Sequence, residues 1–189
     1  AMVMCWITIG CYGFIRHFIL GPNWRWYFIS WAFMALGIIT KGVGFLPVLM
    51  FIPIIAYRLA NKVYFKGRLS FACWLGFVPF FLVLAAWFVP MMITVAEQAT
   101  PELIQYKNNI LFKQTGERYA NAWHHLEPWY YFIVSVIPVM WFPLPILLLS
   151  SLKHVYHKLK TDPVLMILFA WVVLVVCFFS ISPGKRGVY

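Results

Sequence analysis

Long apolar runs, separated by short polar segments, dominate this chain. A bilayer core of about 30 Å needs about 20 apolar residues to be crossed by a helix. Six runs approach or reach this length, with tight turns or interfacial side chains extending the shorter ones. They are residues 1–15, 24–39, 43–57, 71–95, 129–150 and 164–181. The pattern therefore predicts an all-α fold: one polytopic transmembrane helical bundle of about six spans over residues 1–189.

The polar segments between these runs alternate in charge. One set of alternate segments carries nine basic residues and a single acid, Asp162. These basic residues are Arg16, Arg25, Arg58, Lys62, Lys66, Arg68, Lys153, Lys158 and Lys160. The other set carries six basic residues and four acids. By the positive-inside rule, we expect the first set in the cytoplasm and the second set on the extracytoplasmic side.

Only one extracytoplasmic segment, residues 96–127, is long. Thr100-Pro101-Glu102 has the character of a helix start, with a capping side chain, a proline at the first position and an acid in the first turn. Apolar residues then recur at roughly helical spacing as far as Leu111. We expect a short helix lying in the membrane interface, followed by a polar stretch.

The composition agrees with a membrane protein. Hydrophobic residues make up 63% of the chain and charged residues 11%, and the mean hydropathy is +0.83. These values exclude an ordinary soluble domain and a disordered chain. The net charge of +10 is scattered between apolar runs, so it does not indicate nucleic-acid binding. Cys5, Cys11, Cys73 and Cys177 lack the spacing of zinc ligands and are interpreted as small buried hydrophobic residues.

Candidate chemistry gathers on the expected extracytoplasmic face. Lys41, Arg118, Lys185 and Arg186 lie in three separate segments of that face. Such cations can clamp a phosphate by charge-assisted hydrogen bonds, or they can simply reach lipid headgroups. His124 and His125 adjoin each other, and adjacent side chains point apart on regular backbone, so a shared metal is not expected. Both interpretations of the cations stay open on residue type alone.

Four short motifs, in order along the chain, resemble the GT-C membrane glycosyltransferases. They are Ile39-Thr40-Lys41-Gly42, Glu117-Arg118-Tyr119, His125-Leu126-Glu127-Pro128-Trp129-Tyr130-Tyr131, and the turn at residues 180–189 that contains Lys185 and Tyr189. The closest branch contains the bacterial aminoarabinose transferases, which modify lipid A, and enzymes similar to protein O-mannosyltransferases. The chain resembles the central part of such a protein.

The resemblance implies transfer of a sugar from a polyprenyl-phosphate donor to a lipid A, glycolipid or protein acceptor. The reaction would occur at the outer face of the bacterial cytoplasmic (inner) membrane, in a multi-pass protein. Arg118 and Lys185, with Lys41 at a matching turn, would bind the donor phosphate. His125, Tyr119, Arg186 and Tyr189 would line the substrate cavity.

The catalytic acid of the family has no match here and is expected upstream of Ala1. No metal ligand is assigned, and dependence on a divalent metal stays open. Two alternatives also stay open: a transporter or flippase that binds a lipid phosphate, and a non-catalytic membrane subunit.

Overall fold

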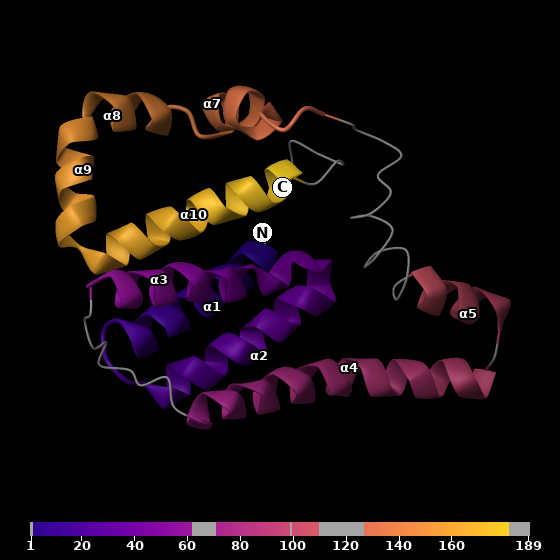
Figure 1. Cartoon of the computed structure of the whole chain (residues 1–189). Helices are drawn as coiled ribbons and strands as arrows, with labels where there is room; N and C mark the ends of the chain where they lie inside the picture. Colours follow the sequence, from indigo (N-terminus) through magenta and orange to yellow (C-terminus); the bar gives the residue numbers. More distant parts are fainter. Residues whose placement is uncertain (1, 62–70, 99, 110–126, 182–189) are drawn as a thin grey trace. The chain divides into compact units, whose positions relative to one another are not determined.

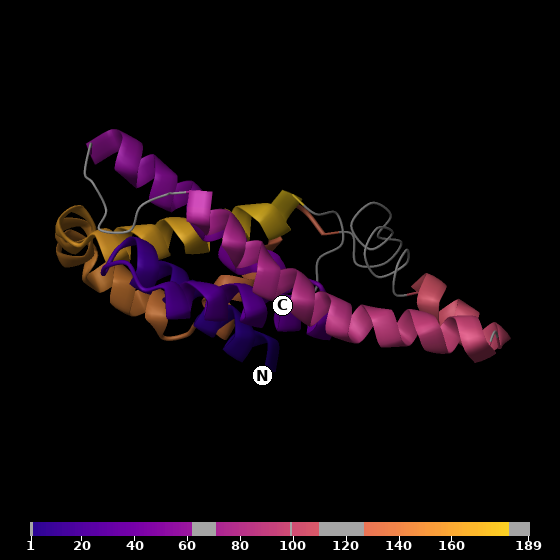
Figure 2. The same cartoon turned by 90° about the horizontal axis from the view of Figure 1, so that it is seen from below.

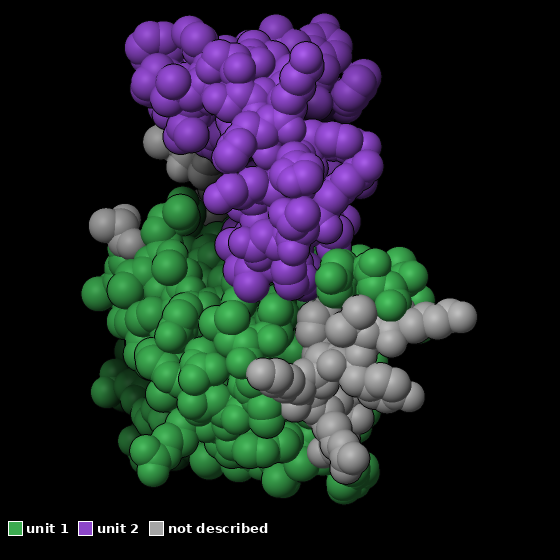
Figure 3. All heavy atoms as spheres, turned by 90° about the vertical axis from the view of Figure 1, so that its left-hand side faces the viewer, with its two compact units in different colours: residues 1–107 green, residues 108–189 purple. Residues whose placement is uncertain are grey.

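The computed structural model describes residues 2–61, 71–98, 100–109 and 127–181. All regular structure within these ranges is helical (Figure 1). The prediction of an all-α membrane protein is therefore confirmed. The chain forms two compact units, Ala1–Lys107 and Asn108–Tyr189, which are coloured separately in Figure 3. Each unit is described by itself.

The first unit is built around a close pair of helices, α1 (Met2–Phe18) and α2 (Trp24–Lys41). Small residues let their backbones approach, as in many membrane helix pairs. A Cβ atom on Gly13 would collide with the Ser30 hydroxyl and with the carbonyl oxygen of Trp26. Only glycine therefore fits at position 13.

A second close approach follows at the other end of α2. The chain turns there into a 3-10 helix, η1 (Val43–Met50), which continues into α3 (Phe51–Asn61). A Cβ atom on Gly37 would lie 2.8 Å from the Cα atom of Gly44, and one on Gly10 would lie 2.9 Å from Cγ of Pro47. Because Gly10 and Gly37 have no side chains, η1 packs closely against both α1 and α2.

Aromatic rings fill the space that these helices enclose. Trp31 lies at the centre: its ring centroid is 5.6 Å from that of Phe14 on α1 and 4.6 Å from that of Phe77 on α4 (Phe77–Gln98). Tyr27 is also buried, and its hydroxyl donates a 2.7 Å hydrogen bond to the carbonyl oxygen of Cys73 in η2 (Phe71–Gly76). Offset and edge-on ring pairs stabilise beyond the apolar area they bury. These contacts join α1, α2 and α4 into one core.

Helix α4 extends beyond this core and leads to α5 (Pro101–Asn108) at its far end (Figures 1 and 2). The apolar side chains of Phe81, Leu82, Val89 and Ile93 are exposed along α4. A lipid environment accommodates such side chains, whereas water would not.

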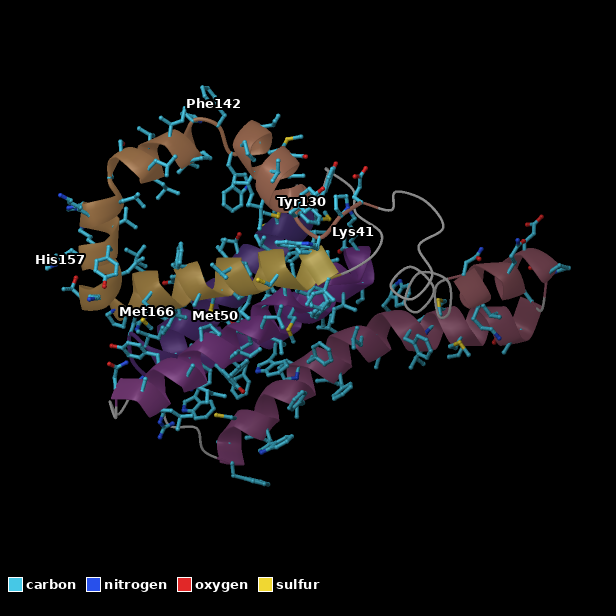
Figure 4. The ribbon with its side chains drawn as sticks, turned by 45° about the horizontal axis from the view of Figure 1, so that its top comes forward. Lys41, Met50, Tyr130, Phe142, His157 and Met166 are labelled. Atoms are coloured by element: carbon cyan, nitrogen blue, oxygen red, sulfur yellow. The ribbon has the colours of Figure 1, made fainter. Side chains whose placement is uncertain are left out.

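The second unit contains a broken apolar segment. A π-helical turn, η4 (Phe132–Val136), and α7 (Ile137–Met140) are followed by α8 (Leu144–Ser150). The two parts meet at a bend of 99° around Phe142, which Figure 4 labels. The sequence predicts one continuous span over residues 129–150, whereas the structure shows a broken one. Pro143 and Pro145 explain why α-helical hydrogen bonding does not continue through this point.

The unit ends with α9 (Leu152–Thr161) and α10 (Pro163–Ile181). Asp162 separates them, and its Oδ1 atom accepts hydrogen bonds from the backbone N–H groups of Val164 (2.9 Å) and Leu165 (3.3 Å). With Pro163 in the first helical position, this cap sets the start of α10.

By length and hydropathy, three helical stretches of the described residues can cross a membrane: Val43–Asn61, Phe71–Gln98 and Pro163–Ile181. Counting the bent pair as one span gives up to four, which is fewer than the six predicted. Helix α1 falls short because it has only 17 residues. Helix α2 has 18 residues, but Arg25, Lys41 and several Trp and Tyr side chains lower its hydropathy.

The cysteines only partly follow their interpretation as buried hydrophobic residues. Cys11 is buried, Cys73 is partly exposed, and Cys5 and Cys177 are exposed. The exposed pair lies on apolar helices, where an outward-facing thiol meets lipid at little cost. The prediction is therefore right for Cys11 and wrong for Cys5 and Cys177.

We predict that Gly13→Ala destabilises the protein by about 1–3 kcal/mol, the usual cost of overpacking. Helix propensity alone predicts the opposite sign, since alanine is favoured over glycine by about 1 kcal/mol. Denaturant unfolding in detergent measures the difference. Gly10→Ala is the matched control and should cost less, because its new methyl group meets a proline ring rather than a backbone oxygen. Unchanged or increased stability of Gly13→Ala would refute the close backbone contact.

Candidate functional site

Of the predicted site residues, Lys41 is the one that lies within the described part of the structure. It is the last residue of α2 and its side chain is exposed; Figure 4 labels it. A cation in this position interacts favourably with the unpaired carbonyl groups at a helix C-terminus. Glycine contacts pack α2 closely against α1 at Gly13 and against η1 at Gly37, so Lys41 is carried by a closely packed helix.

Gly42 ends α2 and makes the turn after Lys41. Its φ angle is 60°, a left-handed value that side chains with a Cβ atom rarely adopt. Its N–H group donates a 2.7 Å hydrogen bond to the carbonyl oxygen of Ile38. The Thr-Lys-Gly part of the first motif thus has a local structural reason, because glycine allows the chain to reverse directly after the lysine.

The third motif is described only from Glu127 onward. The N–H group of Tyr131 donates a 3.0 Å hydrogen bond to the carbonyl oxygen of Pro128, and this bond closes a tight turn. Trp129 and Tyr130 are exposed, and their ring centroids are 5.7 Å apart. Exposed Trp and Tyr side chains of this kind are typical of membrane–water boundaries.

The other six candidate residues lie outside the described residues. They are Arg118, Tyr119, His125, Lys185, Arg186 and Tyr189. The structure therefore does not test whether these side chains meet Lys41, and their roles remain predictions. Among the described residues, no group of three or more His, Cys, Asp or Glu side chains gathers as a metal site would.

The sequence patterns did not predict a buried polar cluster at the α1–α2 connection. His17 is fully buried, and its Nδ1 atom accepts a 3.1 Å hydrogen bond from the N–H group of Asn23. Asn23 in turn caps α2, because its Oδ1 atom accepts from the N–H group of Trp26 at 3.2 Å. The rings of Phe18, Trp24 and Tyr27 pack around the imidazole. The cluster fixes the start of α2, and the asparagine directly before an apolar run was its only sequence signal.

The helices described so far define a multi-pass helical membrane protein. Comparison with known proteins narrows the class. The undecaprenyl phosphate-alpha-4-amino-4-deoxy-L-arabinose arabinosyl transferase of Aeromonas hydrophila is 26% identical over 198 aligned residues, which cover 100% of this chain and 33% of that protein. Proteins of the same name from Yersinia pestis and Yersinia pseudotuberculosis are 27% identical, with 100% of this chain and 32% of each relative covered.

The alignment with these transferases confirms the resemblance that the four motifs predicted, and it covers the whole chain. The chain spans about a third of the length of the curated relatives it matches. No family model matches it, and no solved structure does.

We predict that Gly42→Ala destabilises the protein by about 1–2 kcal/mol, the cost of a left-handed residue with a Cβ atom. Among the described residues, and apart from its chain neighbours, no heavy atom lies within 4 Å of the added methyl group, so the cost is conformational and not steric. Gly42→Asn should be destabilised as well, because the ψ angle of Gly42 is −40°, outside the left-handed helical region that asparagine tolerates. Thermal unfolding in detergent measures both effects. Equal stability of the glycine, alanine and asparagine proteins would contradict the turn described here.

Proposed function

We propose that this chain is part of an integral-membrane glycosyltransferase that uses a polyprenyl-phosphate sugar as its donor. One observation carries the proposal: the whole chain aligns with transferases whose name specifies an undecaprenyl-phosphate sugar. The four motifs that resemble those of the GT-C membrane glycosyltransferases, which follow one another along the chain, also support the proposal. The acceptor is lipid A, another glycolipid or a protein, and transfer takes place at the outer face of the cytoplasmic membrane.

The physical logic of the site follows from where the donor lies. The polyprenyl tail stays in the lipid and its phosphate stays at headgroup level. When the sugar is transferred, its bond to the phosphate oxygen breaks and that oxygen gains negative charge. Arg118 and Lys185 stabilise this charge, because fixed donors aimed at developing charge act most strongly where water is excluded. The fork of an arginine can also hold two phosphate oxygens at once.

Lys41 joins this group from the end of α2. Its position on a well-packed helix favours this phosphate-binding role, because the cation is then in place before the donor arrives. His125, Tyr119, Arg186 and Tyr189 form the surrounding cavity and contact the sugar or the acceptor.

One observation favours the alternative of a lipid-phosphate transporter or flippase. The apolar segment η4–α7–α8 is bent by 99°, and broken helices often form transport sites within the bilayer. The two functions predict different products: a transferase leaves a glycosylated acceptor and free polyprenyl phosphate, whereas a flippase leaves the donor intact. A non-catalytic subunit would leave the donor unchanged and unmoved.

We predict that Arg118→Ala lowers the rate of sugar transfer by about 100- to 1,000-fold, the loss typical of one transition-state hydrogen-bond donor. Arg118→Lys should recover part of the rate because it keeps the charge. The assay uses the full-length protein in proteoliposomes with a radiolabelled polyprenyl-phosphate sugar, and separates transfer from movement of the intact donor.

Lys107→Ala is the matched control, since it removes a cation from the same expected extracytoplasmic segment and should leave transfer unchanged. Normal turnover by Arg118→Ala would remove the role assigned to Arg118. Transport of an intact donor without a glycosylated product would remove the transferase proposal itself.

A further inference from the structure

Helix α9 has two chemically different faces. Leu152, Val155, Tyr156 and Leu159 follow the spacing of a single apolar stripe, because residues three, four and seven apart share one side of a helix. The opposite side carries basic and polar side chains: Lys153, His154, His157, Lys158, Lys160 and Thr161. His157, labelled in Figure 4, belongs to this polar face.

The apolar stripe is not covered by the described part of the protein. Leu152 is 56% exposed and Tyr156 is 61% exposed. Val155 and Leu159 are only partly covered. The side chains of this stripe must therefore contact something other than the described residues.

The position of α9 between two apolar segments indicates what these side chains contact. Helix α8, the second arm of the bent pair, ends directly before it, and α10 starts directly after it. Figures 1 and 2 show α9 running crosswise between the end of α8 and the start of α10. A short helix that is joined crosswise to membrane segments at both ends lies along the bilayer surface.

The charges on α9 are available to an external partner. The nearest acid in sequence is Asp162, and its Oδ1 atom is used to cap the first turn of α10. Lys160 places its ammonium group 4.3 Å from the centroid of the Tyr156 ring. The cation thus lies over the face of the ring, and tyrosine side chains are enriched at membrane–water interfaces.

We infer that α9 is a membrane-surface helix that binds anionic phospholipid headgroups through Lys153, Lys158 and Lys160. Its apolar stripe enters the boundary of the acyl chains. The charge pattern of the sequence predicts that these lysines lie on the cytoplasmic side, where anionic lipids attract basic segments. The inference concerns the lipid around the second unit, and it does not depend on the proposed transferase activity.

The first test measures lipid preference. The full-length protein is reconstituted in nanodiscs of phosphatidylcholine and phosphatidylglycerol, and the lipids that remain bound after transfer to detergent are counted by mass spectrometry. The preference for phosphatidylglycerol should fall about fivefold for each lysine removed in Lys158→Gln/Lys160→Gln. The matched control, Lys158→Arg/Lys160→Arg, keeps both charges and should keep the preference. Equal retention of phosphatidylglycerol by all three proteins would overturn the inference.

A second test measures the depth of the two faces and does not rely on lysine substitutions. Spin labels are placed at Tyr156→Cys and at His154→Cys, in a protein whose Cys5, Cys73 and Cys177 are replaced by serine. The label at position 156 should be accessible to oxygen dissolved in lipid, and the label at 154 to a water-soluble nickel complex. Equal water exposure of both labels would show a solvated helix, and equal lipid exposure would show a membrane span. Either result would contradict the assignment.

Discussion

The contact between the backbones of α1 and α2 is the constraint on which the first unit depends. Gly13 has no side chain, so the Ser30 hydroxyl and the carbonyl oxygen of Trp26 occupy the space where a Cβ atom would lie. This close approach brings Phe14 beside Trp31, and Trp31 then packs against Phe77 of α4. The aromatic core thus follows from a contact between small residues. Lipid tails are as apolar as leucine, so packing of this kind is what holds membrane helices together.

Separate contacts fix the two ends of α2. At its start, His17 and Asn23 satisfy backbone groups that would otherwise be buried without partners. At its end, the turn at Gly42 presents Lys41 on the surface, and Gly37 holds the following η1 helix in place. A cation at the end of a firmly packed helix is well suited to hold a phosphate, because little freedom of the backbone is lost when the ligand binds.

The all-α fold and most of its helices could be predicted because long apolar runs indicate membrane helices. The run at 164–181 corresponds to α10, whose start at Pro163 is set by the side chain of Asp162. The bend near Phe142 was missed because only the hydropathy of residues 129–150 was used, and hydropathy does not register a change of direction. Pro143 and Pro145 are the sequence signal of the break. The burial of His17 was also missed, because it results from rings that come from elsewhere in the fold. Lys41 is the one site residue whose local geometry explains its motif, and the remaining six depend on segments outside the described residues.

We propose above all that separate segments of the chain hold one lipid-linked phosphate. The most direct test is photo-crosslinking of the full-length protein with a polyprenyl phosphate that carries a photoreactive group beside the phosphate, followed by peptide mapping. We expect labelled peptides that contain Lys41, Arg118 and Lys185, with labelling suppressed by excess unmodified polyprenyl phosphate. Labelling confined to the expected cytoplasmic segments, such as that of Arg58 or Lys153, would contradict it.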